Sequence, residues 1–342
     1  MKTWTVGSME IRIYGLCVAL GVLAALLWLS RRTRDTWKPG TVSRFALLAL
    51  PLGFLFARLG ICLVSQGWYL FRSDFFFNFS RGGFMLYGAM AGCVLAAWIT
   101  ARATEQSFPV LLDGIAAPGM LAIACCRFAE GLIGVGYGRP IYDWFDPWAE
   151  QSFFPLEEPD FFLRFPFGIP NYYDEYCWSV FLLEGIAALI FTLILASKKA
   201  QAPGLFLLGL ILYAGAQTVF ESLRADSIPK WGFVRVNQIL SGVALVLALG
   251  LCSRRLLEKG EKIPWGAWAG TAACMGVILA MEFAVEKKIH FLRWMRMDLC
   301  YFVMALASLG LILLGIRIWK RAWEIPESAI APKATREAPI AR

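Results

Sequence analysis

The chain has 342 residues, of which 58% are hydrophobic and only 17% charged, and its mean hydropathy is +0.60. A soluble domain carries about 25% charged residues, so the composition excludes an ordinary soluble protein and indicates one embedded in a membrane. The formal net charge of +8 does not indicate a nucleic-acid partner, because the basic residues fall in the loops between apolar segments.

Nine apolar segments are long enough to cross a bilayer as helices. A hydrocarbon core about 30 Å thick needs roughly 20 apolar residues for each helical crossing. In chain order the segments cover residues 11–30, 43–64, 84–100, 108–126, 178–197, 204–223, 236–252, 264–283 and 298–316. We therefore expect an all-α, polytopic integral membrane protein with about nine transmembrane helices.

The loops between these segments predict an orientation. Of the 33 Lys and Arg residues, 18 fall in one alternating set of loops and 14 in the other, and Arg31, Arg32 and Arg34 form the densest group. Because positively charged loops remain in the cytoplasm, we expect the N-terminus outside and the C-terminus in the cytoplasm. A cleavable signal peptide has its positive charge before the apolar run. Here the charge follows it, so we expect 11–30 to be a retained helix.

The cysteines and the single histidine do not predict a metal site. Most of the nine cysteines are scattered singly in apolar segments, where cysteine acts as a small hydrophobic residue. The pair Cys125 and Cys126 has no second pair at metal-ligand spacing, and His290 is the only histidine. We expect structural cysteines, no metal and no other cofactor.

Two predicted outer loops, 65–83 and 127–177, are rich in aromatic residues, and the second is also acidic. Aromatic side chains anchor at the membrane interface. Two interpretations remain open for these aromatic-rich extracytoplasmic loops: an amphipathic shelf at headgroup depth, or ordinary connections. The tail after Lys320 contains three prolines and is predicted to be a disordered cytoplasmic end.

Several polar side chains lie inside the crossings or at their rims, where they are costly unless they are used. They are Arg58, Asp113, Arg127, Glu130, Glu184, Gln217, Glu221, Arg224 and Gln238. Glu221 and Arg224 are three residues apart, so on a helix they share a face and are expected to pair. The pair is either an architectural element of the bundle or part of an anion site.

In the second interpretation, Arg127 and Arg224, together with Arg58 and Arg139, converge on a phosphate, which suits the guanidinium group. The run from Arg127 to Pro140 also contains four glycines, which allow backbone to approach a ligand closely. At outer-leaflet depth the abundant phosphate belongs to phospholipid headgroups. We therefore expect a glyceryl-phosphate substrate.

Six landmarks in order resemble one family, the prolipoprotein diacylglyceryl transferases. They are Ile13-Tyr14-Gly15-Leu16, Ala57-Arg58-Leu59-Gly60, Gly82 to Ala89, Asp113 to Pro118, Arg127 to Gly138, and Tyr213 to Ser241 with its Glu221-Ser222-Leu223-Arg224-Ala225-Asp226 core. The match covers about residues 10–250. The order and spacing of the landmarks are more specific than any one of them.

The chain also departs from the family pattern. Glu130 stands where the family has Asn, Val135 where it has Glu, and Gln217 where it usually has Arg, while Tyr87 in place of His is a tolerated variant. The segment 264–316 has no counterpart in the seven-crossing form. We therefore identify a divergent member with a transferase-like membrane domain, two additional helices and a cytoplasmic tail. These parts cover residues 1–252, 253–320 and 321–342.

The resemblance implies a phosphatidylglycerol–prolipoprotein diacylglyceryl transferase of the bacterial plasma membrane. Such an enzyme moves the diacylglyceryl group of phosphatidylglycerol to a lipobox cysteine thiol and releases glycerol phosphate. It implies that phosphatidylglycerol, other membrane lipids and a prolipoprotein lipobox peptide are the partners, with no nucleic acid and no metal.

The same resemblance assigns roles to the candidate residues. Arg127 and Arg224 stabilise the departing phosphate, and Tyr14 and Tyr87 donate from their hydroxyl groups. Glu130 or Glu221 accepts the thiol proton, since a thiol with a pKa near 8.5 needs only a modest shift. The remaining phospholipid-binding residues are Arg58, Gly134, Gly138 and Gln217.

Three other functions remain open. The first is a lipid-binding or regulatory membrane protein that kept the fold and lost catalysis, favoured by Gln217 and Val135 and opposed by Arg127 and Glu221. The second is a transferase of the same fold with a different acceptor. The third is a transporter, which the absence of a paired inverted repeat in the sequence disfavours.

Overall fold

The structure is a computed structural model, and it describes residues 3–6, 9–64, 76–77, 83–144, 163–171, 174–200, 202–226, 230–231, 234–287, 290 and 295–323. Most of the predicted outer loop 65–83, the acidic and aromatic segment 145–162 and the predicted tail 324–342 lie outside the described residues. The shelf interpretation and the cytoplasmic tail therefore stay predictions.

Nine α-helices make up most of the described chain. They are α1 (Ile13–Arg32), α2 (Thr41–Val64), α4 (Leu86–Thr104), α5 (Phe108–Glu130), α7 (Val180–Ala196), α8 (Leu205–Leu223), α9 (Val236–Glu258), α10 (Trp265–Val285) and α11 (Met297–Trp323). All but α7 are long and apolar enough to cross a membrane, by length and composition. The predicted all-α polytopic membrane fold is thus confirmed.

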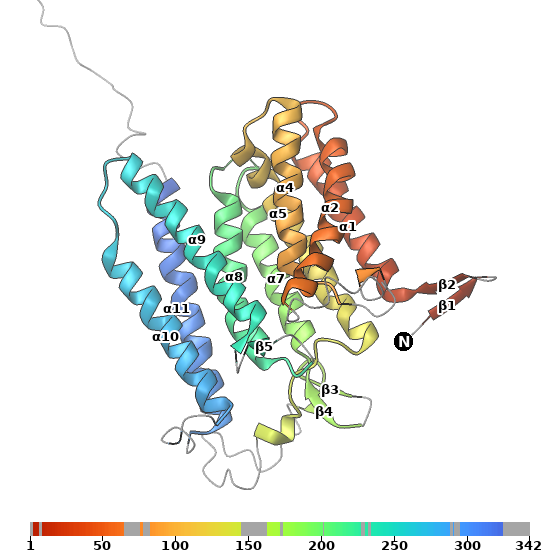
Figure 1. Cartoon of the computed structure of the whole chain (residues 1–342), viewed down its shortest axis with the longest axis vertical. Coiled ribbons are helices and arrows are strands. Elements are labelled where there is room, and N and C mark those ends of the chain that lie inside the picture. The colour runs from red at the N-terminus through yellow and green to blue at the C-terminus, as the bar shows by residue number, and fades with distance from the viewer. Residues whose placement is uncertain are drawn as a thin grey trace, which may run out of the picture.

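Short elements precede α1 or lie between later helices. They are the 3-10 helices η3 (Gly131–Ile133) and η4 (Ile141–Trp144) and the strands β1 (Thr3–Val6), β2 (Met9–Arg12), β3 (Gly168–Pro170), β4 (Tyr176–Trp178), β5 (Lys230–Trp231) and β6 (Val234–Arg235). The strands pair in sequence as three antiparallel hairpins. Figure 1 shows β3 and β4 at the end of the bundle opposite to the C-terminal end of α11.

Helix α7 differs in length from its predicted segment 178–197. It begins at Val180, because Trp178 is the last residue of β4 and pairs with Gly168 of β3. Its 17 residues rise about 25 Å at about 1.5 Å per residue. That length is at the lower limit for a crossing, so α7 counts as a short membrane helix.

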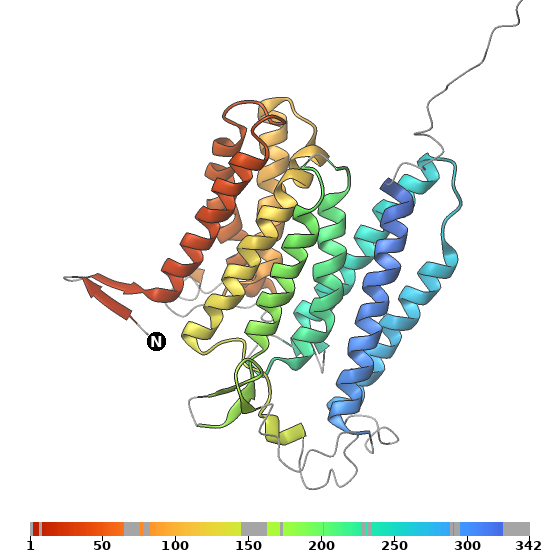
Figure 2. The ribbon, with the colours of Figure 1, turned by 180° about the vertical axis from the view of Figure 1, so that it is seen from behind.

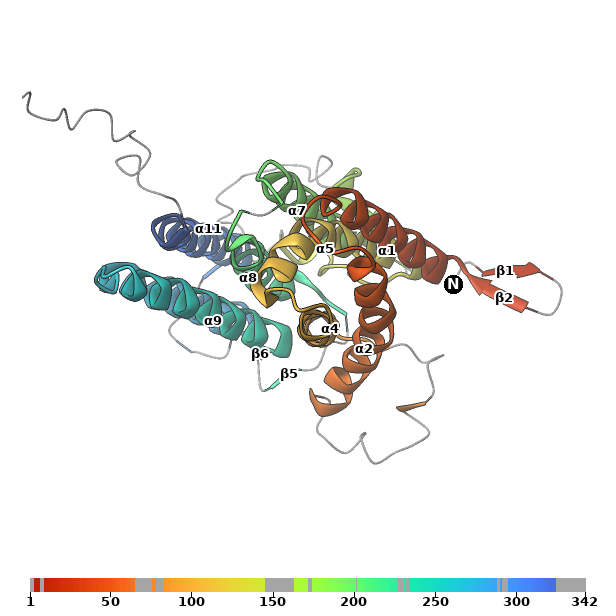
Figure 3. The ribbon, with the colours of Figure 1, turned by 90° about the horizontal axis from the view of Figure 1, so that it is seen from above.

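Helix α8 lies at the centre of the bundle. It packs against α5 and α7 on one side and against α9 and α11 on the other, as the view from above shows (Figure 3). It is the most buried of the candidate spans, since 72% of its apolar 18-residue stretch is buried. Seen from behind, α10 and α11 form a hairpin along the far side of the bundle from α1 (Figure 2). Polar residues on α8 are therefore shielded from lipid.

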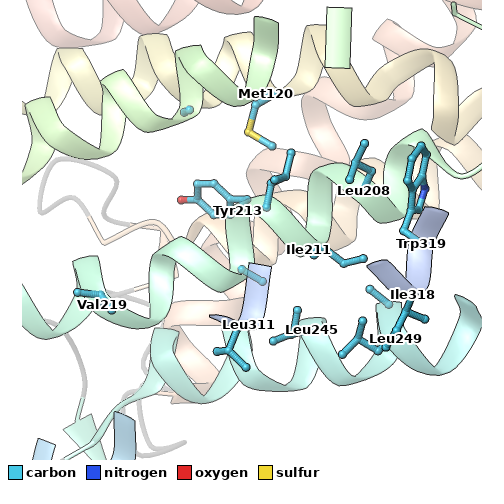
Figure 4. Packing of buried hydrophobic residues seen from close by; sticks show 14 of the residues in the cluster. Met120, Leu208, Ile211, Tyr213, Val219, Leu245, Leu249, Leu311, Ile318 and Trp319 are labelled. Carbon is cyan, nitrogen blue, oxygen red and sulfur yellow. The ribbon is translucent and has the colours of Figure 1, made fainter. Parts of the chain in front are cut away.

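The hairpin of α10 and α11 is part of the apolar core. Side chains of α5, α8, α9 and α11 meet around Ile211, as Figure 4 shows. Gly215 lies so close to α11 that an added Cβ would be 2.6 Å from Ile312 Cγ1, and one at Gly315 would be 2.4 Å from Ile211 Cγ2. Small residues at membrane-helix contacts allow this approach. Ser308 Oγ also donates to the Gly215 carbonyl at 2.8 Å.

Basic residues cap helix C-termini at the end of the bundle opposite to β3 and β4. Arg32 donates to the carbonyls of Ala196 and Lys198 at 3.3 and 2.6 Å, at the end of α7. Lys38 Nζ donates to the Thr104 carbonyl at 2.8 Å, at the end of α4. Cations stabilise the negative end of a helix dipole. The basic cluster that predicts the cytoplasmic side therefore also stabilises the fold.

Asp113 caps the N-terminus of α8 and is not part of the candidate site. Its carboxylate accepts the backbone N–H groups of Gly204 and Phe206, both at 2.9 Å, at the N-terminus of α8. A carboxylate there satisfies N–H groups that lack a partner within the helix and complements the helix dipole.

We expect Asp113→Ala to lower the free energy of unfolding by about 1 to 2 kcal/mol, the range for loss of a helix cap. Thermal unfolding of the purified protein in detergent measures this effect. Asp35→Ala is the control, because Asp35 is exposed in the turn after α1. Equal unfolding midpoints for the two variants would show that the cap contributes nothing.

Candidate active site

Arg127 and Glu130 lie at the end of α5, where the helix passes into a glycine-rich turn. Arg127 is in the last turn of α5 and Glu130 is its last residue. The helical chain stops because Gly134, after η3, adopts a left-handed conformation with φ of 70°, and Gly136 follows with φ of 80°. Glycine adopts such angles without the clash of a Cβ. The turn thus places both charged side chains at the rim of the bundle.

Arg127, Glu130, Arg224 and Glu184 form a closed ring of alternating charges, hereafter the charge ring. Arg127 contacts Glu130 Oε1 at 2.7 Å and Glu184 Oε2 at 3.0 Å. Arg224 contacts Glu130 Oε2 at 2.9 Å and Glu184 Oε2 at 3.1 Å. The two arginines thus share both carboxylates. Their convergence on a phosphate stays a prediction.

The two carboxylates of the charge ring differ in burial. The Glu184 side chain is 0% exposed and the Glu130 side chain 15%, while those of Arg127 and Arg224 are 8% and 4% exposed. Glu184 comes from α7 and lies on the inner side of the ring, whereas Glu130 lies toward its open side. Buried ions of this kind are stable only when they are paired.

A second polar group adjoins the ring on α8 and α9. Gln217 Nε2 donates to Glu184 Oε1 at 3.0 Å and to Glu221 Oε1 at 2.8 Å. Asn237 Nδ2 also donates to Glu221 Oε1, at 2.9 Å. In the part of the chain that the structure describes, the other oxygen of Glu221 and the Asn237 side-chain carbonyl oxygen are buried without a hydrogen-bond partner. Each of these oxygens is able to accept a hydrogen bond.

The predicted pairing of Glu221 with Arg224 is wrong. Among the described residues, Arg224 pairs with Glu130, Glu184 and Asp226, and no ion pair joins it to Glu221. The reason is competition from other partners. Three carboxylates on other segments engage the Arg224 guanidinium, while Gln217 and Asn237 donate to Glu221.

Asp226 fixes Arg224 to the glycine-rich turn. Its carboxylate accepts from Arg224 Nε at 3.1 Å and Nη2 at 2.7 Å, and from the Gly136 backbone N–H at 3.1 Å. Burial alone would raise the pKa of Asp226, but the hydrogen bonds and charge of Arg224, with the Gly136 amide, hold that pKa below its ordinary value. Asp226 is therefore ionised, and it fixes the orientation of the Arg224 guanidinium group in the charge ring.

The glycine-rich turn packs closely against its neighbours. An added Cβ at Gly136 would lie 2.7 Å from Glu130 Oε2, and one at Gly138 would lie 2.7 Å from Trp178 Cβ. Gly138 also bridges to Arg224 as an isolated antiparallel pair. Both glycines thus permit close backbone packing. The phospholipid-binding role of Gly134 and Gly138 stays a prediction.

Tyrosines surround the ring on the side of α1, α4 and α8. Arg127 Nη2 donates to the Tyr213 hydroxyl at 3.0 Å, and the Tyr213 and Tyr87 rings lie 6.4 Å apart. The Tyr87 hydroxyl lies 2.6 Å from Ser241 Oγ. Tyr14, in the first turn of α1, is close enough to Glu130 and Arg127 to interact with their charges. The roles of Tyr14 and Tyr87 as hydroxyl donors stay predictions.

Arg58 has partners away from the ring. It is fully buried in α2, and it donates to the carbonyls of Phe76 at 3.2 Å and Gly83 at 2.8 Å. Its guanidinium also lies 5.5 Å from the centre of the Phe84 ring. These contacts hold the connection before α4 to α2. A phospholipid-binding role for Arg58 stays a prediction.

An apolar cavity lies beside the partner of Arg127. It has a volume of about 240 Å³ and is lined by residues of α1, α4, α5 and α8, among them Val22, Met90, Cys126 and Tyr213. Tyr213 is also the residue whose hydroxyl group Arg127 contacts. The wall of the apolar cavity is thus linked to the charge ring through Tyr213. In the part of the chain that the structure describes, no group of three or more His, Cys, Asp or Glu side chains is placed to hold a metal ion.

The α10–α11 hairpin contacts the segments that carry the site. Glu282 of α10 accepts from Ser222 Oγ at 2.5 Å and from Gln238 Nε2 at 3.4 Å. Glu286 pairs with Arg139 at 2.9 Å. A cavity of about 540 Å³ lies between α9 and α10, with Gln238 and Glu282 in its wall. The hairpin thus supports the residues next to Glu221 and Arg224.

Comparison with known proteins agrees with the geometry. The family model described as "Prolipoprotein diacylglyceryl transferase" matches residues 2–254, well over half of the chain. The chain belongs to the prolipoprotein diacylglyceryl transferase family. The match ends before α10, so the α10–α11 hairpin lies outside the family model.

Curated relatives carry the name phosphatidylglycerol–prolipoprotein diacylglyceryl transferase. The chain is 28% identical to one from Listeria welshimeri over 259 residues, which is 74% of this chain and 88% of the relative. It is 28% identical to one from Symbiobacterium thermophilum over 266 residues (75% and 94%) and 29% identical to one from Acaryochloris marina over 261 residues (75% and 92%). The resemblance to this family is thereby confirmed, and the chain is classed with transferases.

Reasoning from the sequence missed Glu184, Tyr213, Asp226 and Asn237 as members of the site. Glu184 carried a detectable signal, because a carboxylate in the middle of an apolar segment is costly unless it is paired. Tyr213 and Asp226 are part of a landmark of the prolipoprotein diacylglyceryl transferase family but gave no sign of their partners. Their partners lie on other helices, and only the fold brings them together.

Proposed function

We propose that this chain transfers the diacylglyceryl group of phosphatidylglycerol to the cysteine thiol of a prolipoprotein lipobox. The observation that carries the proposal is the pair Arg127 and Arg224, joined through Tyr213 to the wall of an apolar cavity, in a chain of this family. An apolar cavity suits the acyl chains, and two guanidinium groups suit the phosphate. The relatives named above bear the name of this activity.

In the proposed reaction the thiolate sulfur of the lipobox cysteine attacks the glyceryl carbon that is esterified to phosphate. The carbon–sulfur bond forms while the carbon–oxygen bond to phosphate breaks, and glycerol phosphate leaves. Negative charge grows on the leaving phosphate oxygen. Arg127 and Arg224 stabilise that charge, and preorganised donors of this kind usually give the largest part of a rate enhancement.

The thiol proton needs an acceptor near the cavity. Within the described ranges, Glu221 has a buried oxygen without a hydrogen-bond partner, whereas both oxygens of Glu130 are engaged by arginines. Glu221 is therefore the better proton acceptor, and Asn237 holds it in place. Gln217 positions the same carboxylate, and the hydroxyl groups of Tyr14 and Tyr87 contribute at the edge of the site.

We place the protein in the bacterial plasma membrane with the site on the outer side. The basic residues that cap helix ends lie at one end of the bundle and the charge ring at the other. Since basic ends remain in the cytoplasm, the N-terminus is outside and the C-terminus inside. Membrane lipids thus reach the ring from the outer leaflet.

The test is transfer by the purified full chain in vesicles of phosphatidylglycerol. A lipobox peptide is added, and mass spectrometry follows its gain of one diacylglyceryl group. A peptide with Ser in place of the cysteine is the control, because its hydroxyl does not form a thiolate. Transfer to the cysteine peptide alone supports the proposal, and absence of transfer from a folded protein contradicts it.

A lipid-binding protein without transfer activity is the second candidate. It is favoured by Gln217, which uses its amide to hold Glu184 and Glu221 where the family usually has an arginine. With this change, the two guanidinium groups pair with three carboxylates, Glu130, Glu184 and Asp226, and among the described residues Glu221 pairs with neither arginine. Binding of phosphatidylglycerol with no transfer to any lipobox peptide would favour this candidate.

A further inference from the structure

The Glu130 carboxylate lies between the two arginines on the open side of the charge ring. One oxygen contacts Arg127 Nη1 at 2.7 Å and the other contacts Arg224 Nη1 at 2.9 Å. Among the described residues, its carboxylate has no other hydrogen-bond partner. Glu130 thus bridges the same two guanidinium groups that the proposed function assigns to the lipid phosphate.

A carboxylate and a phosphodiester are alike in the features that the arginines recognise. Each carries one negative charge, and each presents two oxygens that accept charge-assisted hydrogen bonds from guanidinium groups. A phospholipid phosphate is therefore able to replace Glu130 between Arg127 and Arg224 with no change in the charge of the ring. With Glu130 in place, the same two nitrogens are already engaged.

The surroundings indicate that Glu130, and not Glu184, is the member that moves. Glu184 is completely buried and is also held by Gln217. Glu130 is partly exposed and stands at the end of α5, directly before Gly131. Gly136, which packs against its carboxylate, has a left-handed backbone conformation. Glu130 is therefore the carboxylate with the fewest contacts to lose.

We propose that Glu130 is a built-in competitor of the substrate phosphate: it occupies the phosphate position in the lipid-free protein and swings out when an anionic phospholipid binds. Glu130 thereby sets the affinity of the site for a phosphate-bearing lipid. The inference rests on the proposed function in one respect, that Arg127 and Arg224 hold the lipid phosphate.

The test is the affinity of the Glu130→Gln variant for short-chain phosphatidylglycerol, measured in detergent by titration calorimetry with the full chain. Glutamine keeps the size of the side chain but removes the charge that holds it between the arginines. We expect the dissociation constant to fall about tenfold or more, since tenfold corresponds to only about 1.4 kcal/mol and leaving a buried charge without its partner costs more than that. A short-chain diacylglycerol, which has the tails and no phosphate, should bind both proteins equally.

Three comparisons make the result specific. Glu286→Gln removes a nearby carboxylate that pairs with Arg139 outside the ring, and it should leave the affinity unchanged. Glu130→Asp keeps the charge but is one methylene shorter, so it should contact one arginine and give an intermediate affinity. Glycerol 1-phosphate should compete with the lipid more strongly in Glu130→Gln than in the wild type, which separates binding of the phosphate from binding of the lipid tails.

Unchanged or weaker binding of phosphatidylglycerol by Glu130→Gln and Glu130→Asp would overturn the inference, as would an equal gain for diacylglycerol. These outcomes are distinct from failure of the proposed function. If binding tightens as expected and the wild type transfers nothing to a lipobox peptide, the competitor role stands and the transferase proposal falls. If the wild type transfers and binding does not change, the reverse holds.

Discussion

Replacing Arg127 with Lys is expected to lower the rate of diacylglyceryl transfer by about a hundredfold or more, the effect of losing one preorganised donor to a developing anion. The stability of the fold should change much less. Lysine keeps the positive charge but presents it as a single point, whereas the planar guanidinium contacts two oxygens of a phosphate at once.

The contacts of Arg127 explain the size of this effect. Its nitrogens are directed to Glu130 at 2.7 Å, to Tyr213 at 3.0 Å and to Glu184 at 3.0 Å. A lysine ammonium group cannot reach all three partners in this planar arrangement. The phosphate would therefore contact a single ammonium group in place of the two adjacent N–H donors of a guanidinium group.

Turnover and thermal stability of the same purified variant separate the two roles of Arg127. Arg139→Lys is the matched control, because Arg139 pairs with Glu286 outside the charge ring and is more exposed; it should retain turnover. If Arg127→Lys keeps its turnover and loses stability, Arg127 seals the bundle and does not act on the phosphate. The lipid-binding candidate would then be preferred to the transferase.

The helices were predictable because membrane helices follow from local composition alone. A run of about 20 apolar residues is stable as a helix in a bilayer or in a protein core, where its backbone groups hydrogen-bond within the helix. The difference of two residues at the start of α7 is also local. Trp178 is apolar and falls in the predicted crossing, but its backbone pairs with Gly168 of β3, and hydropathy gives no sign of such pairing.

The charged residues of the site could be predicted from the sequence, but the residues with which they pair could not. Arg127 and Arg224 stood out because charge within a membrane is costly unless used. Their connection through Glu184 depends on how α7 packs against α5 and α8, which no local pattern encodes. The expected pair of Glu221 and Arg224 does not form because Glu130, Glu184 and Asp226 engage Arg224 instead.

The role of the α10–α11 hairpin was beyond prediction for the same reason. Glu282 was visible in the sequence only as a charge near the end of an apolar segment. In the structure its carboxylate accepts from Ser222 and Gln238, each next to a residue of the second polar group. The helices outside the family model thereby support residues inside it.

Replacing Glu184 with Ala should cause the largest loss of stability. We expect the free energy of unfolding to fall by about 3 to 5 kcal/mol, the range for removing one partner of a buried ion pair. The Glu184 side chain is 0% exposed and contacts both Arg127 and Arg224. Without it, two buried guanidinium groups face each other with one shared carboxylate, and the Gln217 amide loses an acceptor.

Thermal and chemical unfolding in detergent measure this loss, with Glu258→Ala as the control. Glu258 pairs with Arg254 at 3.2 Å, but both side chains are largely exposed, so that pair is worth only about 0 to 1 kcal/mol. The contrast follows from burial, because water replaces a lost partner at the surface but does not reach the inside of the charge ring. If the two variants lose equal stability, the buried ring does not hold α5, α7 and α8 together, and its charges are kept for the lipid alone.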